Sequence, residues 1–259
     1  MRRQPAPRRR AVRAAGSQPI CDSDSFATLG AVRLNKVGIT GGSFFLCLGL
    51  LWVWLAQPPA PAFLLVAWFA VVAAAECFIP GEANQVSLAR AHLAAPALVY
   101  ALAAAFGPLA VVLAVAGLTD LVDGTVARRF DKPSTLGGGL DPIVDGVLLG
   151  AVALGLAFGG IFPLWLAAVI VARYLLPAIG GLVLISLHRR PELRHTVSGQ
   201  VSTSLIIVLV GGICLFRFMN QDATNVVIGA EIAIPIATLA TFVHLGWAAR
   251  RPVVAPEPG

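Results

Sequence analysis

Four aspartates stand close together in an otherwise apolar chain, and they are the residues best suited to do chemistry: Asp120, Asp123, Asp141 and Asp145. Apolar segments flank them on both sides. Burying even one charge in or against a membrane costs several kcal/mol. Four carboxylates together are therefore expected to be held by positive charge, and divalent metal ions are the simplest source of it.

The spacing of these residues places them on two helix faces. With about 100° per residue in an α-helix, the first set falls on one side of a helix: Asp120, Asp123, Gly124 and Ala127. The second set, spaced four apart, shares a side of the next helix: Gly137, Asp141 and Asp145. Two antiparallel helices facing each other would bring the four carboxylates to one point.

The chemistry of this stretch favours a metal and a phosphate ligand. Hard carboxylate oxygens suit Mg²⁺ or Mn²⁺ better than zinc. Small residues at 124, 127 and 137 leave the helix faces bare, so a bulky polar ligand can approach the backbone. Arg128, one turn beyond Gly124, offers a planar fork that suits phosphate. The alternative is that the acids are scattered in loops or pair with Arg128 and Arg129.

The stretch from Asp120 to Asp145 resembles the signature of the CDP-alcohol phosphotransferase (CDP-alcohol phosphatidyltransferase) family, D-x2-D-G-x2-A-R-x8-G-x3-D-x3-D, and it matches every fixed position. The resemblance covers residues 83–250 and implies a six-helix catalytic core. It implies a phospholipid-synthesis reaction in which an acceptor alcohol displaces CMP from a CDP-alcohol, usually CDP-diacylglycerol. It also implies that the four aspartates hold the metal ions, that Asp141 and Asp145 are catalytic, and that Asp145 is the candidate general base.

The same resemblance assigns a nucleotide site. The residues that it implies there are Gly124, Ala127, Arg128, Gly137, Asn84 and Ser87. Asn84 and Ser87 resemble the start of the family's first core helix, Pro-Asn-x-x-Thr/Ser-x-x-Arg, with Ala83 in place of the proline. The alternative interpretation is an ordinary helix N-cap followed by an arginine, Arg90, at the inner membrane face.

Arg173 lies in the middle of an apolar segment, where an unpaired cation is expensive. It looks like the family arginine that binds the phosphate of a phosphorylated acceptor, such as glycerol 3-phosphate or an inositol phosphate. The alternatives are an ion pair with an acid of another helix and a neutral acceptor such as serine or choline. Gln200 and Gly146 depart from the Gly-Lys-x-x-Thr and Asp-Lys that phosphatidylglycerophosphate synthases of this family often carry.

Composition indicates an all-α polytopic membrane protein. The 259 residues are 58% hydrophobic and 12% charged, whereas a soluble domain carries roughly 25% charged residues. Eight apolar segments approach the ~20 residues that a bilayer requires. They are residues 37–56, 61–80, 88–105, 107–129, 138–158, 162–186, 197–217 and 224–247. Glu76, near the end of one segment, is expected to snorkel, and His92 is expected to be structural.

The expected organisation has four parts. They are a disordered basic cytoplasmic tail at 1–36, two additional transmembrane helices at 37–82, the six-helix core at 83–250 and a second cytoplasmic tail at 251–259. If every segment crosses, 17 of the 19 Lys and Arg lie on one side with the aspartate stretch. That side is expected to be the cytoplasm, in a bacterial inner membrane. Membrane lipid is the expected surroundings, nucleic acid is not an expected partner, and the resemblance implies a homodimer.

Two other functions remain open. A secondary transporter or cation channel would also place acids in the membrane. However, these acids cluster at one membrane face instead of following a path across it, and they accompany Arg128 and small residues that admit a nucleotide. The second alternative is an inactive scaffold of the same fold.

Overall fold

The computed structural model describes residues 35–79, 82–130, 137–186 and 197–250. Side chains are described throughout these ranges except at 82–83, 120–139, 141, 181–200 and 247–250. The described helices belong to one compact unit, Leu34–Gly259. Almost all of the predicted tail at 1–36, and the whole of the tail at 251–259, lie outside the described residues.

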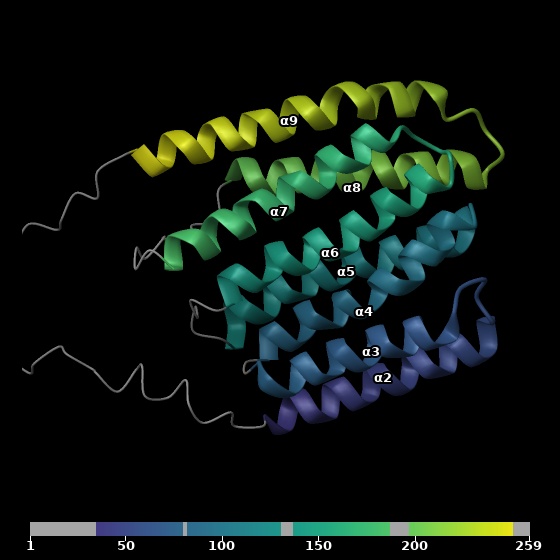
Figure 1. Cartoon of the computed structure of the whole chain (residues 1–259), viewed down its shortest axis with the longest axis vertical. Coiled ribbons are helices and arrows are strands. Elements are labelled where there is room, and N and C mark those ends of the chain that lie inside the picture. The colour runs from purple at the N-terminus through teal and green to yellow at the C-terminus, as the bar shows by residue number, and fades with distance from the viewer. Residues whose placement is uncertain (1–34, 80–81, 131–136, 187–196, 251–259) are drawn as a thin grey trace, which may run out of the picture. The chain divides into compact units, whose positions relative to one another are not determined.

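The described residues form helices and turns, which confirms the all-α prediction (Figure 1). The helices are α2 Lys36–Ala56, α3 Ala62–Phe78, α4 Glu82–Leu102, α5 Phe106–Phe130, α6 Gly137–Phe158, α7 Leu164–Ser186, α8 Val197–Phe218 and α9 Thr224–Arg250. Each predicted apolar segment corresponds to one of them. The third apolar segment begins at residue 88, inside α4, and α4 itself begins at Glu82, just before the helix start expected at Asn84. Its first turns are polar but buried, so the helix extends beyond the apolar run.

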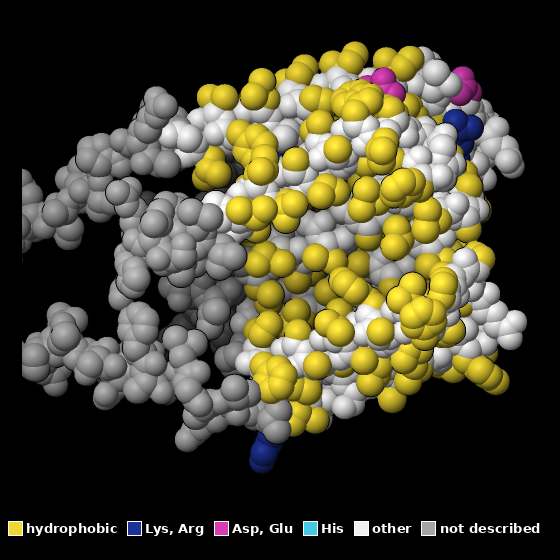
Figure 2. Space-filling model, in the orientation of Figure 1, with side chains coloured by type: hydrophobic (Ala, Val, Ile, Leu, Met, Phe, Trp, Pro, Cys, Tyr) yellow, Lys and Arg dark blue, Asp and Glu magenta, His cyan; other side chains and the backbone are white. Residues whose placement is uncertain are grey.

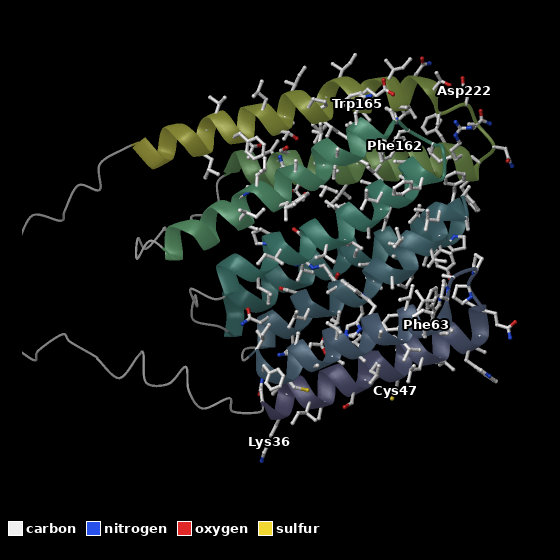
Figure 3. The ribbon with its side chains drawn as sticks, viewed as in Figure 1. Lys36, Cys47, Phe63, Phe162, Trp165 and Asp222 are labelled. Carbon is white, nitrogen blue, oxygen red and sulfur yellow. The ribbon has the colours of Figure 1, made fainter. Side chains whose placement is uncertain are left out.

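The helices run up and down, so their ends alternate between two sides. Lys36 lies at one end of the helices and Asp222 at the other (Figure 3). Short connections close the Asp222 end, at residues 57–61, 103–105, 159–163 and 219–223. Gly160, with a φ of 74°, supplies a left-handed turn there. The end of α5 and the start of α6, which carry the aspartate stretch, lie at the Lys36 end (Figure 1).

The outer surface is that of a membrane protein. On the face that Figure 2 shows, hydrophobic side chains are spread over the described residues, with few charged ones among them. Three helical stretches are long and apolar enough to cross a membrane, and they are Lys36–Ala56, Val201–Phe218 and Thr224–Gly246. Shorter apolar stretches lie at Ala62–Phe78, Phe106–Thr119, Pro142–Phe158 and Leu164–Gly180. The described part of α4 is too polar to belong to the long apolar stretches or to the shorter ones. The number of crossings therefore stays a prediction.

α4 is the central helix, because it packs against α2, α3, α5 and α6. Small buried residues recur along α4 at helical spacing, at Ala94, Ala97 and Ala101, and Ala101 lies against Gly155 of α6. Across this contact a Cβ on Gly155 would lie 2.9 Å from the backbone oxygen of Leu98. Small residues allow helix backbones to approach closely where no water drives association. The spacing of α4 and α6 is therefore set by their backbones.

The two additional helices, α2 and α3, form a hairpin that is just as closely packed. A Cβ on Gly42 would lie 2.9 Å from the backbone oxygen of Ala73. Both helices also contact α4. The hairpin is thus joined to the helix that begins the predicted core.

Candidate active site

An ion pair joins the central helix to the last aspartate of the signature. Arg90 of α4 donates from Nη1 to Oδ1 of Asp145 on α6, at 2.8 Å. The Arg90 side chain is only 3% exposed, and that of Asp145 is 23% exposed. A charge-assisted hydrogen bond of this kind is strong when it is partly withdrawn from water. The close packing of α4 on α6 brings the two residues together across the helix interface.

Asn84 and Ser87 lie on the same side of α4 as Arg90, because the three residues are spaced three apart. All three are buried. The N-cap interpretation of Asn84 was wrong, since α4 has already begun at Glu82. The nucleotide role of Asn84 and Ser87 stays a prediction. Arg90 is part of the spacing Asn-x-x-Ser-x-x-Arg, so a signal for it was present in the sequence. The sequence analysis interprets it only as an arginine at the inner membrane face.

A small pocket adjoins this ion pair. Its walls are Arg90, Asp145 and aliphatic or small residues of α5, α6 and α8: Leu113, Ala116, Gly117, Leu148, Leu149 and Ile207. A Cβ on Gly117 would meet nothing within 4 Å, so the α5 wall is open at that position. The pocket thus combines a charged end with an apolar wall.

The remaining signature residues are placed only by their helices. Asp120, Asp123, Gly124, Ala127 and Arg128 lie in the last turns of α5, and Gly137 and Asp141 lie in the first turns of α6. Their side chains lie outside the described residues, so the convergence of four carboxylates stays a prediction.

The donors available to a metal can be judged at one position. Among the side chains that are described, no three His, Cys, Asp or Glu residues form a cluster. Asp145, the one aspartate of the four with a described side chain, presents a carboxylate to the pocket. That hard oxygen donor fits Mg²⁺ or Mn²⁺.

Arg173 lies in a cage of hydroxyl groups inside the bundle. Only 5% of the residue is exposed. Its Nη1 donates to Ser202 Oγ at 2.5 Å and to Thr241 Oγ1 at 3.2 Å, and its Nη2 donates to Thr203 Oγ1 at 3.2 Å. These partners come from α8 and α9, so three helices meet at the guanidinium. Sequence reasoning singled out Arg173 but missed the hydroxyl groups.

Tyr174 completes the cage. Its hydroxyl donates to Thr203 Oγ1 at 3.3 Å, and its ring centroid lies 5.4 Å from the Arg173 guanidinium carbon. α7 can approach α6 here because residue 146 is glycine. A Cβ on Gly146 would lie 2.9 Å from Tyr174 Cγ. The departure from Asp-Lys at this position therefore has a steric reason, since Tyr174 fills the space that a lysine would need.

The described residues thus form an all-α polytopic membrane protein, in which Arg90 is buried against a carboxylate and Arg173 is buried among hydroxyl groups. The model for the CDP-alcohol phosphatidyltransferase family matches residues 82–243. This match covers more than half of the chain, and the chain belongs to that family.

Curated relatives agree with the family assignment. A probable cardiolipin synthase (CMP-forming) of Drosophila melanogaster is 30% identical over 43% of this chain and 40% of its own length. A cardiolipin synthase (CMP-forming) of Streptomyces coelicolor is 44% identical over 24% of this chain and 29% of its own. The CDP-diacylglycerol–glycerol-3-phosphate 3-phosphatidyltransferase of Bacillus subtilis is 28% identical over 53% of this chain and 69% of its own.

These matches are partial. The matched stretch spans well under half the length of the first two relatives. No solved structure matches the chain significantly.

Proposed function

We propose that the protein transfers a phosphatidyl group from CDP-diacylglycerol to an acceptor alcohol and releases CMP. The observation that carries this proposal is the ion pair between Arg90 and Asp145 at a pocket with an apolar wall. It holds the last carboxylate of the family signature at the edge of that pocket.

In this reaction the acceptor oxygen forms a bond to the phosphorus that bears the diacylglycerol. The bond from that phosphorus to the oxygen of CMP breaks, and the acceptor hydroxyl loses its proton. Asp145 is the base that takes the proton, and Arg90 fixes the direction of its carboxylate. When bound, two Mg²⁺ or Mn²⁺ ions held by Asp120, Asp123, Asp141 and Asp145 would neutralise the diphosphate charge.

The nucleotide part of the donor would lie between the signature helices and α4. Gly124, Ala127 and Gly137 leave room for the diphosphate, and Arg128 would bind it as a planar fork. Asn84 and Ser87, buried on the side of α4 that bears Arg90, would add hydrogen bonds.

Arg173 would bind the phosphate of the acceptor. A guanidinium fork suits phosphate oxygens. Thr241 donates its own O–H to the backbone oxygen of Ala237, but Ser202 and Thr203 accept hydrogen bonds from Arg173 and still have an O–H that can donate to the same phosphate. The resulting site favours a phosphorylated acceptor, such as glycerol 3-phosphate or an inositol phosphate, over serine or choline.

A second acceptor class is indicated by the names of the relatives. Cardiolipin carries two phosphatidyl groups on one glycerol, so a cardiolipin synthase that forms CMP requires a lipid acceptor with a phosphodiester. Such an acceptor would also bring a phosphate to Arg173. It differs from glycerol 3-phosphate in being membrane-bound.

We place the reaction at the cytoplasmic face of a bacterial inner membrane, in a homodimer. If every apolar segment crosses the membrane, 17 of the 19 Lys and Arg lie on the side of the aspartate stretch, which favours the cytoplasmic side.

The test uses the purified chain in lipid nanodiscs with Mg²⁺ and radiolabelled CDP-diacylglycerol. CMP and lipid products are measured with glycerol 3-phosphate, inositol phosphate, phosphatidylglycerol, serine or choline as acceptor. CMP release that depends on one phosphorylated acceptor confirms the proposal. Failure of all five acceptors to release CMP would exclude it and leave the transporter and scaffold alternatives.

A further inference from the structure

The α2–α3 hairpin is fastened to α4 by polar contacts that lie inside the apolar bundle. Trp52 Nε1 of α2 donates to Tyr100 Oη at 2.6 Å, and Trp68 Nε1 of α3 donates to the backbone oxygen of Ala91 at 3.0 Å. A third contact joins Glu76 of α3 to His92 of α4. Lipid-facing additions to a bundle need only apolar packing, so this set of contacts requires a separate explanation.

Glu76 and His92 form the most deeply buried of these contacts. Glu76 Oε1 and His92 Nε2 lie 3.2 Å apart, and the two residues are 0% and 4% exposed. The imidazole ring lies between Phe45 of α2 and Phe69 of α3, with ring centroids 5.5 Å and 5.9 Å away. The sequence suggested that Glu76 snorkels. This prediction was wrong, because its side chain is buried beside His92. All three helices determine where His92 lies.

The end of α3 also holds the first turns of α4. Gln85 Nε2 donates to the backbone oxygen of Glu76 at 3.2 Å and to that of Ile79 at 2.6 Å. Gln85 and His92 are seven residues apart and so face the same direction, toward the hairpin. The hairpin thus fixes α4 at two successive levels, through Gln85 and through His92.

The opposite side of α4 faces the candidate active site. Arg90 is two residues from His92, which places it about 200° around the helix. It reaches Asp145 from that side. A rotation of α4 that broke the contact between Glu76 and His92 would therefore also move Arg90 relative to Asp145.

We propose that Glu76 and His92 are positioning residues for the active site, and that they act through α4 on Arg90. This inference rests on the proposed function. A buried polar pair contributes little net stability compared with apolar residues of similar size, but it restricts the geometry in which helices can pack. The α2–α3 hairpin is then part of the catalytic apparatus and sets the rotation of α4.

The experiment separates positioning from stability. Glu76→Gln, Glu76→Leu and the double variant Glu76→Leu/His92→Leu are prepared as the full chain in nanodiscs. For each, we measure the midpoint of thermal unfolding, kcat and KM for both substrates, and hydrogen exchange of the backbone over residues 84–92. Trp52→Phe is the matched control, because it removes a hydrogen bond of the same interface at the far end of α4.

Glu76→Gln keeps a hydrogen-bond acceptor and is expected to retain kcat. Glu76→Leu should lower kcat roughly tenfold to a hundredfold and speed exchange over 84–92, while KM for the acceptor stays unchanged. The double variant should recover the unfolding midpoint but not kcat. Trp52→Phe should lower the midpoint and leave kcat unchanged.

Two results distinguish the possible failures. If the wild-type chain releases CMP and kcat follows the unfolding midpoint across all variants, the pair is only structural and the inference is overturned. If the wild-type chain releases no CMP with any acceptor, the proposed function fails instead.

Discussion

The backbone of Gly146 in α6 packs against the side chain of Tyr174 in α7. Gly146 follows Asp145 in the chain, and Tyr174 follows Arg173. A Cβ on Gly146 would lie 2.6 Å from Tyr174 Cβ and 2.9 Å from Cγ. This contact links the two buried arginine sites, because Gly146 adjoins the carboxylate that Arg90 binds and Tyr174 closes the cage around Arg173. The size of residue 146 therefore affects both sites.

Gly146→Ala is expected to destabilise the protein by about 1–3 kcal/mol, the usual cost of overpacking, and to lower kcat/KM for both substrates. Gly150→Ala is the matched control, because the new Cβ would lie 3.6 Å from Val171 Cγ2, an ordinary contact with the same helix. Thermal unfolding and CMP release measure the two effects. Equal unfolding midpoints for the two variants would show that α6 and α7 move apart at residue 146 without loss of stability.

Arg173→Gln is expected to raise KM for a phosphorylated acceptor roughly tenfold to a hundredfold, since hydrogen bonds to a charged group are worth about 1.5–3 kcal/mol. KM for CDP-diacylglycerol should change little. Arg217→Gln, at an exposed arginine near the Asp222 end, controls for the loss of one positive charge. Initial rates at varied acceptor concentration provide the measurement. An unchanged acceptor KM would remove Arg173 from the acceptor site.

Asp145→Asn should abolish CMP release and leave binding of the CDP-lipid largely intact, because the amide keeps the size of the carboxylate but cannot take a proton. Turnover and CDP-diacylglycerol binding are measured on the same preparation. Asp222→Asn is the control aspartate at the other end of the helices. Turnover near the wild-type rate in Asp145→Asn would rule out the base role.

Removal of divalent metal with EDTA should stop CMP release, and Mg²⁺ or Mn²⁺ should restore it. Ca²⁺ is added in a parallel experiment to compare a larger ion with these two. The readouts are CMP release and the unfolding midpoint with and without each ion. The midpoint should rise with metal in the wild-type chain and rise less in Asp145→Asn. Full turnover in excess chelator is the result that this prediction forbids.

Asp222 should make the stability of α9 depend on pH. Hydrogen bonds from the Thr224 hydroxyl, at 2.6 Å, and from the Thr224 backbone N–H, at 2.9 Å, lower the pKa of Asp222. A lowered pKa means that the stabilisation is complete above the ordinary aspartate value near pH 4 and is lost as the pH falls below it. Asp222→Ala should therefore unfold at a lower temperature than wild type at pH 7, and the difference should shrink toward pH 3. A difference independent of pH would contradict the assignment.

The fold was largely predictable because each helix coincides with an apolar segment. α4 shows where that approach stops. Its apolar run begins six residues after the helix does because Asn84, Gln85 and Ser87 are polar, yet all three are buried. Hydropathy records how apolar a residue is, and it does not record whether a polar residue has partners in another helix.

The candidate site was predictable only where its residues are close in sequence. The signature places its acids on α5 and α6 as expected, but Arg90 and Asp145 are 55 residues apart and Arg173 and Thr241 are 68 apart. Such contacts depend on which helices pack together. Single serines and threonines in apolar helices also carry no spacing signal, so Ser202, Thr203 and Thr241 could not be connected to Arg173 from the sequence.

The near-touching backbones of α4 and α6 limit how this protein can move. With Gly155 pressed against the Leu98 carbonyl, α4 and α6 cannot come closer at that level, and the contact between Arg90 and Asp145 holds them together at another, as long as the hairpin keeps the rotation of α4. The wall that α5 forms is filled less tightly, since a Cβ on Gly117 would meet no atom of the described residues within 4 Å, and we expect movement at that wall instead. Spin labels should report a constant separation of α4 and α6 during turnover and a changing separation of α5 and α6. The reverse pattern would show that α5 is not the helix that moves.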